Sequence, residues 1–63
     1  MNFLFEDINL NSDLCGERFF VRCDSREEAL KIIEAETNFD IRNLICLGKY
    51  HDWEAEAMGY DTY

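Results

Sequence analysis

The residues of this sequence that offer chemistry are one histidine, three cysteines and two serines. His51 stands directly before Asp52, as in an acid–base pair, but no serine or cysteine lies at a fixed local spacing from it. Ser12 and Ser25 have turn and helix-cap neighbours instead. Because nucleophilic catalysis needs a nucleophile within reach of a base, we expect no catalytic residues and no enzyme activity.

Cys15, Cys23, Cys46 and His51 could in principle bind zinc. Their spacing is C-x7-C-x22-C-x4-H, without the paired C-x2-C knuckles that are typical of structural zinc sites. An odd number of cysteines also argues against a disulfide framework and favours reduced thiols that pack as small apolar groups. We therefore expect three free thiols, no metal site and no cofactor.

Carboxylates dominate the remaining polar residues, and the formal net charge is −8. Residues 18–49 hold six acids and six bases, so the whole excess lies in the two ends of the sequence. The acids of the two ends are Glu6, Asp7, Asp13, Glu17, Asp52, Glu54, Glu56 and Asp61. We expect the ends to meet in the fold and form one acidic surface. The alternative is an ordinary solvated face that serves solubility.

This charge selects the class of partner. Nucleic-acid phosphates and anionic membranes would repel such a protein, so a basic protein surface is the expected partner, with no direct nucleic-acid or membrane contact. A composition of 48% hydrophobic and 14% aromatic residues indicates one folded domain over residues 1–63 rather than a disordered acidic tail. The stretch MNFLFEDINL has no signal-peptide pattern and no apolar run reaches a membrane span, so we expect a cytoplasmic protein.

Three segments are predicted to be strands. Residues 2–5 and 18–23 are aromatic and β-branched, and residues 43–50 form an apolar run that is typical of a buried, central strand. Residues 6–17 are rich in Asn, Asp and Ser and are expected to be irregular. In residues 18–23, Phe19, Val21 and Cys23 should point to one face and Phe20 and Arg22 to the other. We expect the first strand and the tail at the sheet edges.

Residues 24–38 carry the signals of a helix. Ser25 and Glu28 fit a capping box, and the helical period gives a buried stripe of Ala29, Leu30, Ile33 and Thr37. The strand–helix–strand order from 18 to 50 favours a crossover connection. The predicted fold class is therefore α+β: a small, mainly antiparallel sheet with one helix (residues 24–38) packed on one face.

The tail HDWEAEAMGYDTY allows two structures. Its alternation favours a strand, in which Glu54 and Glu56 would lie on one face roughly 6.7 Å apart, a spacing of the same order as the phosphates of DNA, which repeat every ~3.4 Å along each strand. Its Ala and Glu content, with Asp52 as a cap and Gly59 as a stop, favours a short helix instead. The sequence leaves residues 52–58 open between strand and helix.

Aromatic residues accompany these acids. We expect Trp53 to help cover the sheet and Tyr60 and Tyr63 to form an aromatic rim of a partner-binding surface, because Tyr and Trp are enriched at protein interfaces.

In its small size, its pI near 4.3 and its acidic ends FEDINLNSDLCGE and HDWEAEAMGYDTY, the chain resembles phage-encoded anti-CRISPR proteins. The resemblance covers the whole chain in composition and rests on no motif, so no residue is carried over by position. It implies a phage or mobile-element inhibitor that blocks the basic nucleic-acid channel of a CRISPR effector as a DNA mimic. We expect a monomer or small homo-oligomer. An anti-restriction DNA mimic and a small regulatory or antitoxin-like protein that binds a cationic surface remain as alternatives.

Overall fold

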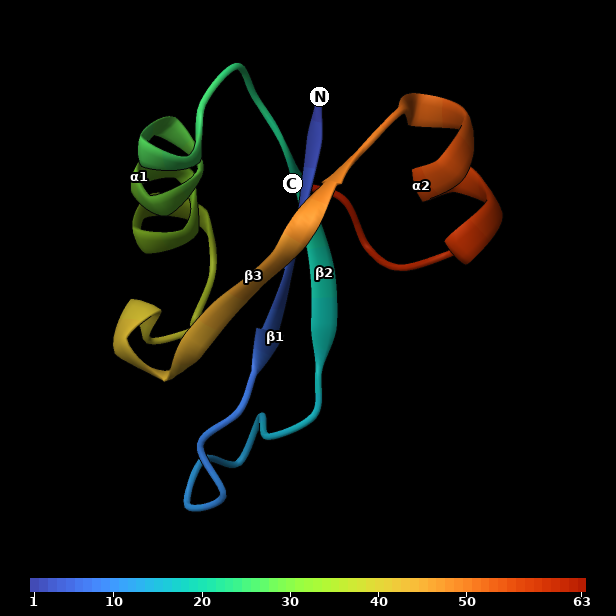
Figure 1. Cartoon of the computed structure of the whole chain (residues 1–63). Coiled ribbons are helices and arrows are strands. Elements are labelled where there is room, and N and C mark those ends of the chain that lie inside the picture. The colour runs from blue at the N-terminus through green and yellow to red at the C-terminus, as the bar shows by residue number, and fades with distance from the viewer.

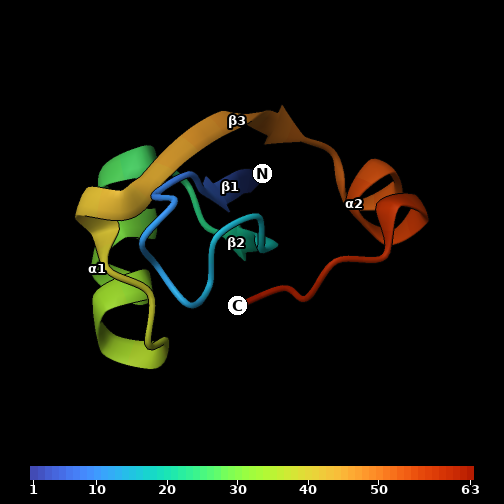
Figure 2. The ribbon, with the colours of Figure 1, turned by 90° about the horizontal axis from the view of Figure 1, so that it is seen from below.

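A three-stranded antiparallel sheet forms the middle of the molecule, with one helix on each side (Figures 1 and 2). The computed structural model describes all 63 residues. Its elements are β1 (Asn2–Asp7), β2 (Arg18–Arg22), α1 (Arg26–Glu36), a 3-10 turn η1 (Ile41–Asn43), β3 (Leu44–Tyr50) and α2 (Asp52–Met58). The predicted α+β class, with a small antiparallel sheet and a helix packed on it, is confirmed.

The strand order is β2-β1-β3, so β1 is the central strand. The expected placement, with the first strand at an edge and residues 43–50 in the centre, is wrong. Burial explains the observed order, because Leu4 and Phe5 point to opposite faces of β1 and both are buried. The residues of β3 instead alternate between half-buried and exposed along the strand. A register shift against β1 changes the side to which the half-buried residues point, so that Leu44 and Cys46 adjoin the α1-side core and Tyr50 adjoins the other.

Each face of the sheet has its own small core. On the α1 face, Phe5, Phe19 and Val21 pack with Ala29 and Ile33 of the helix. On the opposite face, Leu4 and Phe20 pack with Ala55 of α2. The expected alternation of residues 18–23 is confirmed, since Phe19, Val21 and Cys23 join one core and Phe20 joins the other. The prediction of a single helix was incomplete: a second helix covers the second face (Figure 2).

Local signals set the bounds of both helices. The Ser25 hydroxyl accepts a hydrogen bond from the Glu28 N–H at 3.1 Å and caps α1. Of the two structures that the sequence allowed for residues 52–58, the tail forms the helix. The Glu54 carboxylate accepts a hydrogen bond from the His51 N–H at 3.0 Å, and Gly59 ends α2 at φ 77°, a left-handed conformation that favours glycine.

The last residues return to the sheet. The Phe20 N–H donates to the Asp61 carbonyl at 2.7 Å, and the Tyr63 N–H donates to the Phe20 carbonyl at 2.8 Å. The two segments run parallel, with a bridge between Phe20 and Thr62. The expected place of the tail at a sheet edge is therefore confirmed for residues 61–63, which pair with the outer side of β2.

The three thiols are not joined to one another. Cys23 is buried in the α1-side core, where burial raises the pKa of its thiol and so favours the neutral form. Cys46 is half-buried beside the same core, and Cys15 is exposed in the loop between β1 and β2.

Asp7 organises that loop from inside the fold. Its side chain is buried, and its carboxylate accepts hydrogen bonds from the Asn9 N–H at 3.0 Å and the Ser12 hydroxyl at 2.7 Å. Its backbone carbonyl accepts from the Gly16 N–H at 2.7 Å. Asp7 therefore does not belong to an acidic surface, and our expectation from the sequence that it would is wrong. The loop needs an acceptor at its base, and Asp7 supplies it.

Replacing Asp7 with alanine should destabilise the fold, because it removes the acceptor of two hydrogen bonds in a buried position. We expect the free energy of unfolding, measured by urea denaturation, to fall by about 1–3 kcal/mol. Asp13→Ala, at an exposed position of the same loop, should change it by less than about 0.5 kcal/mol. Equal losses in the two variants would contradict the role given to Asp7.

Candidate functional site

Helix α2 rests on the sheet through one small side chain. Ala55 is its only buried residue and packs against Leu4 and Phe20. Because an α-helix turns about 100° per residue, Asp52 and Glu56 share one flank of α2, beside Ala55. We call the surface formed by α2, by Gly59, Tyr60 and Thr62 and by the sheet residues beneath them the α2 face.

Trp53 points away from the sheet. It lies two positions before Ala55, which is about 200° around a helix, and it is 70% exposed. The expectation that Trp53 covers the sheet is therefore wrong: the helix gives the inward position to Ala55. For the same reason Glu54 and Glu56 do not share a face, and the phosphate-like spacing expected for a strand does not occur.

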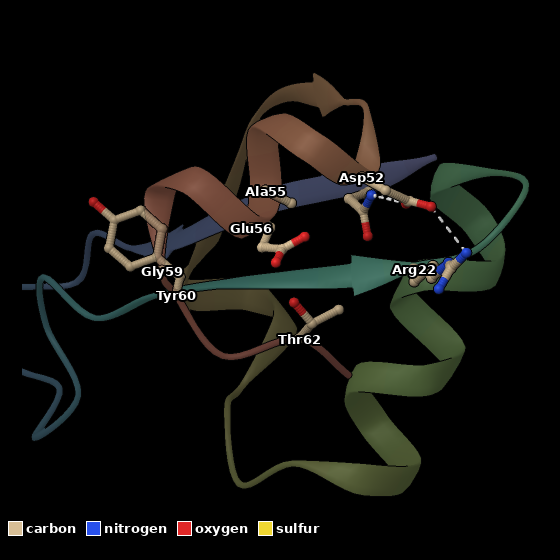
Figure 3. Close-up of a pocket in the computed structure, with 8 residues that line it drawn as sticks. Arg22, Asp52, Ala55, Glu56, Gly59, Tyr60 and Thr62 are labelled. Atoms are coloured by element: carbon tan, nitrogen blue, oxygen red, sulfur yellow. Dashed lines mark hydrogen bonds and ion pairs between the residues drawn. The ribbon is translucent and has the colours of Figure 1, made fainter.

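A clamp fastens the start of α2 to the sheet. The Asn2 side-chain amide donates to one oxygen of Asp52 at 2.7 Å, and the Arg22 guanidinium donates to the other at 2.9 Å (Figure 3). The hydrogen bond from Asn2, assisted by the charge of Arg22, lowers the pKa of Asp52 below its ordinary value. Asp52 thus connects α2 to both β1 and β2.

Both arginines of β2 are neutralised on the α2 face. Arg18 and Arg22 alternate with the residues of the α1-side core and so point the same way as Phe20. Arg18 pairs with Glu6 of the neighbouring strand at 2.5 Å, and Arg22 pairs with Asp52. Glu54 and Glu56 of α2 take part in none of the molecule's three ion pairs. The outer part of this face is therefore negative.

The structure divides the eight predicted acidic residues into four groups. Asp7 is buried. Asp13 and Glu17 lie in the loop that follows the end of β1, whereas Asp52 contacts the first residue of β1, so the loop and the start of α2 are at opposite ends of the sheet (Figure 1). The acids of the α2 face are Glu6, Asp52, Glu54 and Glu56, whereas Asp61 precedes Thr62 in the extended C-terminal segment and alternates to the opposite side. The two acidic ends thus meet only in part.

The predicted aromatic rim lies partly at the surface. Tyr60 and Tyr63 are 37% and 39% exposed. The ring of Tyr60 packs against Phe20 with centroids 6.0 Å apart, and the ring of Tyr63 meets Phe19 edge-on at 5.6 Å. Because Phe20 and Phe19 belong to the cores on opposite faces of the sheet, the two tyrosines do not form one rim, and only Tyr60 adjoins α2. The role of either tyrosine in binding stays a prediction.

An open hollow of about 570 Å³ lies between α2, the sheet and the C-terminal segment. We call it the α2 hollow. Figure 3 shows Glu56 and Thr62 pointing toward one another across β2, with Arg22 and Asp52 at one end and Tyr60 at the other. Its lining residues are Asn2, Arg22, Asp52, Ala55, Glu56, Gly59, Tyr60 and Thr62. Sequence analysis missed Asn2, Arg22 and Thr62 because only the tertiary fold brings them beside α2.

Metal sites, membrane spans and known relatives do not point to a function for this chain. No group of three or more His, Cys, Asp or Glu side chains is arranged to hold a metal ion. Neither helix has the length and apolar character needed to cross a membrane. Comparison of the chain with protein-family models, with curated proteins and with solved structures finds no match. The charge and shape of the α2 face are therefore the basis for inferring function.

The clamp predicts a pH dependence of stability. Because the pKa of Asp52 is lower in the folded state, its carboxylate adds stability at pH values above its unfolded pKa of about 3.9. This contribution is lost as the pH falls through the folded-state pKa. The difference in free energy of unfolding between the wild type and Asp52→Asn should therefore be largest at neutral pH and shrink in acid.

Chemical denaturation at a series of pH values measures this difference. Asp61→Asn is the matched control, since the Asp61 carboxylate makes no ion pair. A difference for Asp52→Asn that is the same in acid as at neutral pH would show that the clamp does not stabilise the fold through its charge.

Proposed function

We propose that this protein is an inhibitor that binds the basic, nucleic-acid-binding surface of another protein, with a CRISPR effector as the favoured target. One observation carries the proposal: Trp53 is 70% exposed on a face whose carboxylates outnumber its bases. The two arginines of that face are already paired within the molecule. An incoming cationic surface therefore meets unpaired carboxylates and an exposed indole.

Electrostatic attraction supports the choice of partner class. The net charge of −8 attracts a basic surface over a distance and accelerates its association. The same attraction weakens as salt screens it. A basic surface that normally holds nucleic acid has the complementary charge, and a protein bound there excludes the nucleic acid.

Trp53 gives the site an apolar anchor. Tryptophan is enriched among the residues that contribute most to protein interfaces, and its ring also attracts Arg and Lys side chains with about 0.5–1 kcal/mol at exposed sites. Asp52 and Glu54 flank it in the sequence. The combination fits a partner surface where basic side chains surround an apolar contact.

The exposed indole also favours a second candidate function. Imitation of DNA phosphates needs carboxylates and makes no use of a protruding Trp53. A small regulatory or antitoxin-like protein that binds a cationic surface without competing with nucleic acid would use it. An anti-restriction mimic would use the α2 face in the same way as an anti-CRISPR protein. Competition with nucleic acid separates inhibitor from regulator, and the identity of the displaced enzyme separates the two inhibitors.

Neutralising the outer acids of the α2 face should weaken inhibition. The Glu54→Gln, Glu56→Gln double variant keeps an oxygen at position 54 to cap α2 and changes the net charge from −8 to −6. We expect it to displace labelled DNA from purified CRISPR effectors about fivefold less well, since an exposed ion pair contributes up to about 1 kcal/mol. Added salt should reduce the difference.

Glu34→Gln, Glu36→Gln is the matched control, because both residues are exposed on α1 and the net charge is again −6. This variant should displace DNA as well as the wild type does. Equal weakening of DNA displacement in the two double variants would show that total charge acts without a specific site. If the wild-type protein itself displaces no DNA, only the regulatory alternative remains.

Trp53→Ala should separate binding from folding. The side chain is largely exposed, so the free energy of unfolding should change by less than about 0.5 kcal/mol. Displacement of DNA should fall by about tenfold or more, as for a tryptophan anchor at an interface. Full inhibition by a folded Trp53→Ala protein would show that α2 does not face the partner.

A further inference from the structure

The α2 hollow already contains one guanidinium at one of its ends. Arg22 donates to one Asp52 oxygen at 2.9 Å, and the Asn2 amide occupies the other oxygen at 2.7 Å. The ion pair between Arg22 and Asp52 therefore satisfies the charge at this end. The hollow extends beyond it along the flank of α2 as far as Tyr60 and Thr62 (Figure 3).

Glu56 is the unpaired carboxylate of the hollow. It lies one helical turn after Asp52 on the same flank of α2 and lines the hollow, but it takes part in none of the ion pairs. Its side chain points at Thr62, whose hydroxyl faces it across the space above β2 (Figure 3). Both groups accept hydrogen bonds, so a group with several donors between them would satisfy both.

The far walls of this space are held in place by Phe20. Tyr60 packs its ring against the Phe20 ring, and Thr62 is bridged to the Phe20 backbone. Phe20 itself is completely buried. Thr62 is therefore held in place opposite Glu56, whereas the Tyr60 ring closes the far end of the hollow and points away from the space between them (Figure 3).

No Lys or Arg side chain of this chain is free to fill the space. Arg18 is paired with Glu6, Arg22 with Asp52 and Arg42 with Asp40. The charge of the N-terminal ammonium acts on Asp52, at the end of the hollow that Arg22 already neutralises. Lys49 is the strand partner of Phe3, which packs on the α1 side of the sheet. Arg26 and Lys31 belong to α1. Among its charged lining residues, the hollow holds two acids and one base, which leaves one negative charge to be matched from outside.

We propose that the α2 hollow receives one arginine side chain of the basic partner, with the guanidinium between Glu56 and Thr62. This inference rests on the proposed function and adds the residue that the partner inserts. Arginine fits better than lysine, because its planar fork carries five donors and pairs with a carboxylate through two bonds while further donors reach a second acceptor.

The test uses the whole protein and a small probe, N-acetyl-arginine methylamide, followed by ¹⁵N NMR titration. We expect the largest shifts at Glu56, Gly59, Tyr60 and Thr62. Glu56→Gln should weaken binding of the probe about fivefold, the effect of removing one charge-assisted contact. Glu34→Gln, at an exposed α1 position, should bind like the wild type. N-acetyl-lysine methylamide should bind less tightly than the arginine probe.

Three results would overturn the inference: shifts spread evenly over the carboxylates of both helices, unchanged binding by Glu56→Gln, or equal binding of the lysine and arginine probes. The outcome is separable from that of the proposed function. Loss of DNA displacement in Trp53→Ala with no probe site at Glu56 would leave the α2 face as the binding surface without an arginine pocket. Binding of the probe at Glu56 without any DNA displacement would support the arginine pocket and contradict the proposed inhibitor function.

Discussion

The need to bury the second face of the sheet determines the shape of this molecule. In a chain of 63 residues, Leu4 and Phe20 are completely or almost completely buried on that face, and burial of side chains of this size contributes about 1.5–3 kcal/mol each. The covering element is only the seven-residue helix α2 and the segment after it. Isolated helices shorter than about 12 residues are marginal in water, so α2 depends on contacts with the sheet.

Those contacts leave the outside of α2 free for another use. Ala55 supplies the apolar contact, Glu54 caps the helix, and Asp52 joins it to Asn2 and Arg22. The one positive charge that holds the acidic helix, on Arg22, thus lies on β2 and not on α2 itself. The exposed side of α2 therefore combines Trp53 with unpaired carboxylates, an arrangement that works against compaction by self-repulsion and suits a cationic partner.

Local patterns predicted the elements, and tertiary contacts decided how they are used. The alternation of residues 18–23 and the Ser25 cap identified β2 and α1, because both depend on neighbours in the sequence. The apolar run of β3 pointed to a central strand, yet β1 takes that place because its side chains are buried on both faces. Trp53 was misplaced because W-E-A-E-A fits a strand as well as a helix. The buried role of Asp7 depends on the path of the loop, which no local pattern specifies.

The central claim is that the α2 face is the surface that binds a basic, nucleic-acid-binding partner. Hydrogen–deuterium exchange of this protein, alone and bound to an effector from which it displaces DNA, tests that claim most directly. The account predicts slower exchange in residues 52–63 of the bound protein, with the exchange of α1 unchanged. Slower exchange in α1 or along the outer edge of β3, with residues 52–63 exchanging as in the free protein, would contradict it.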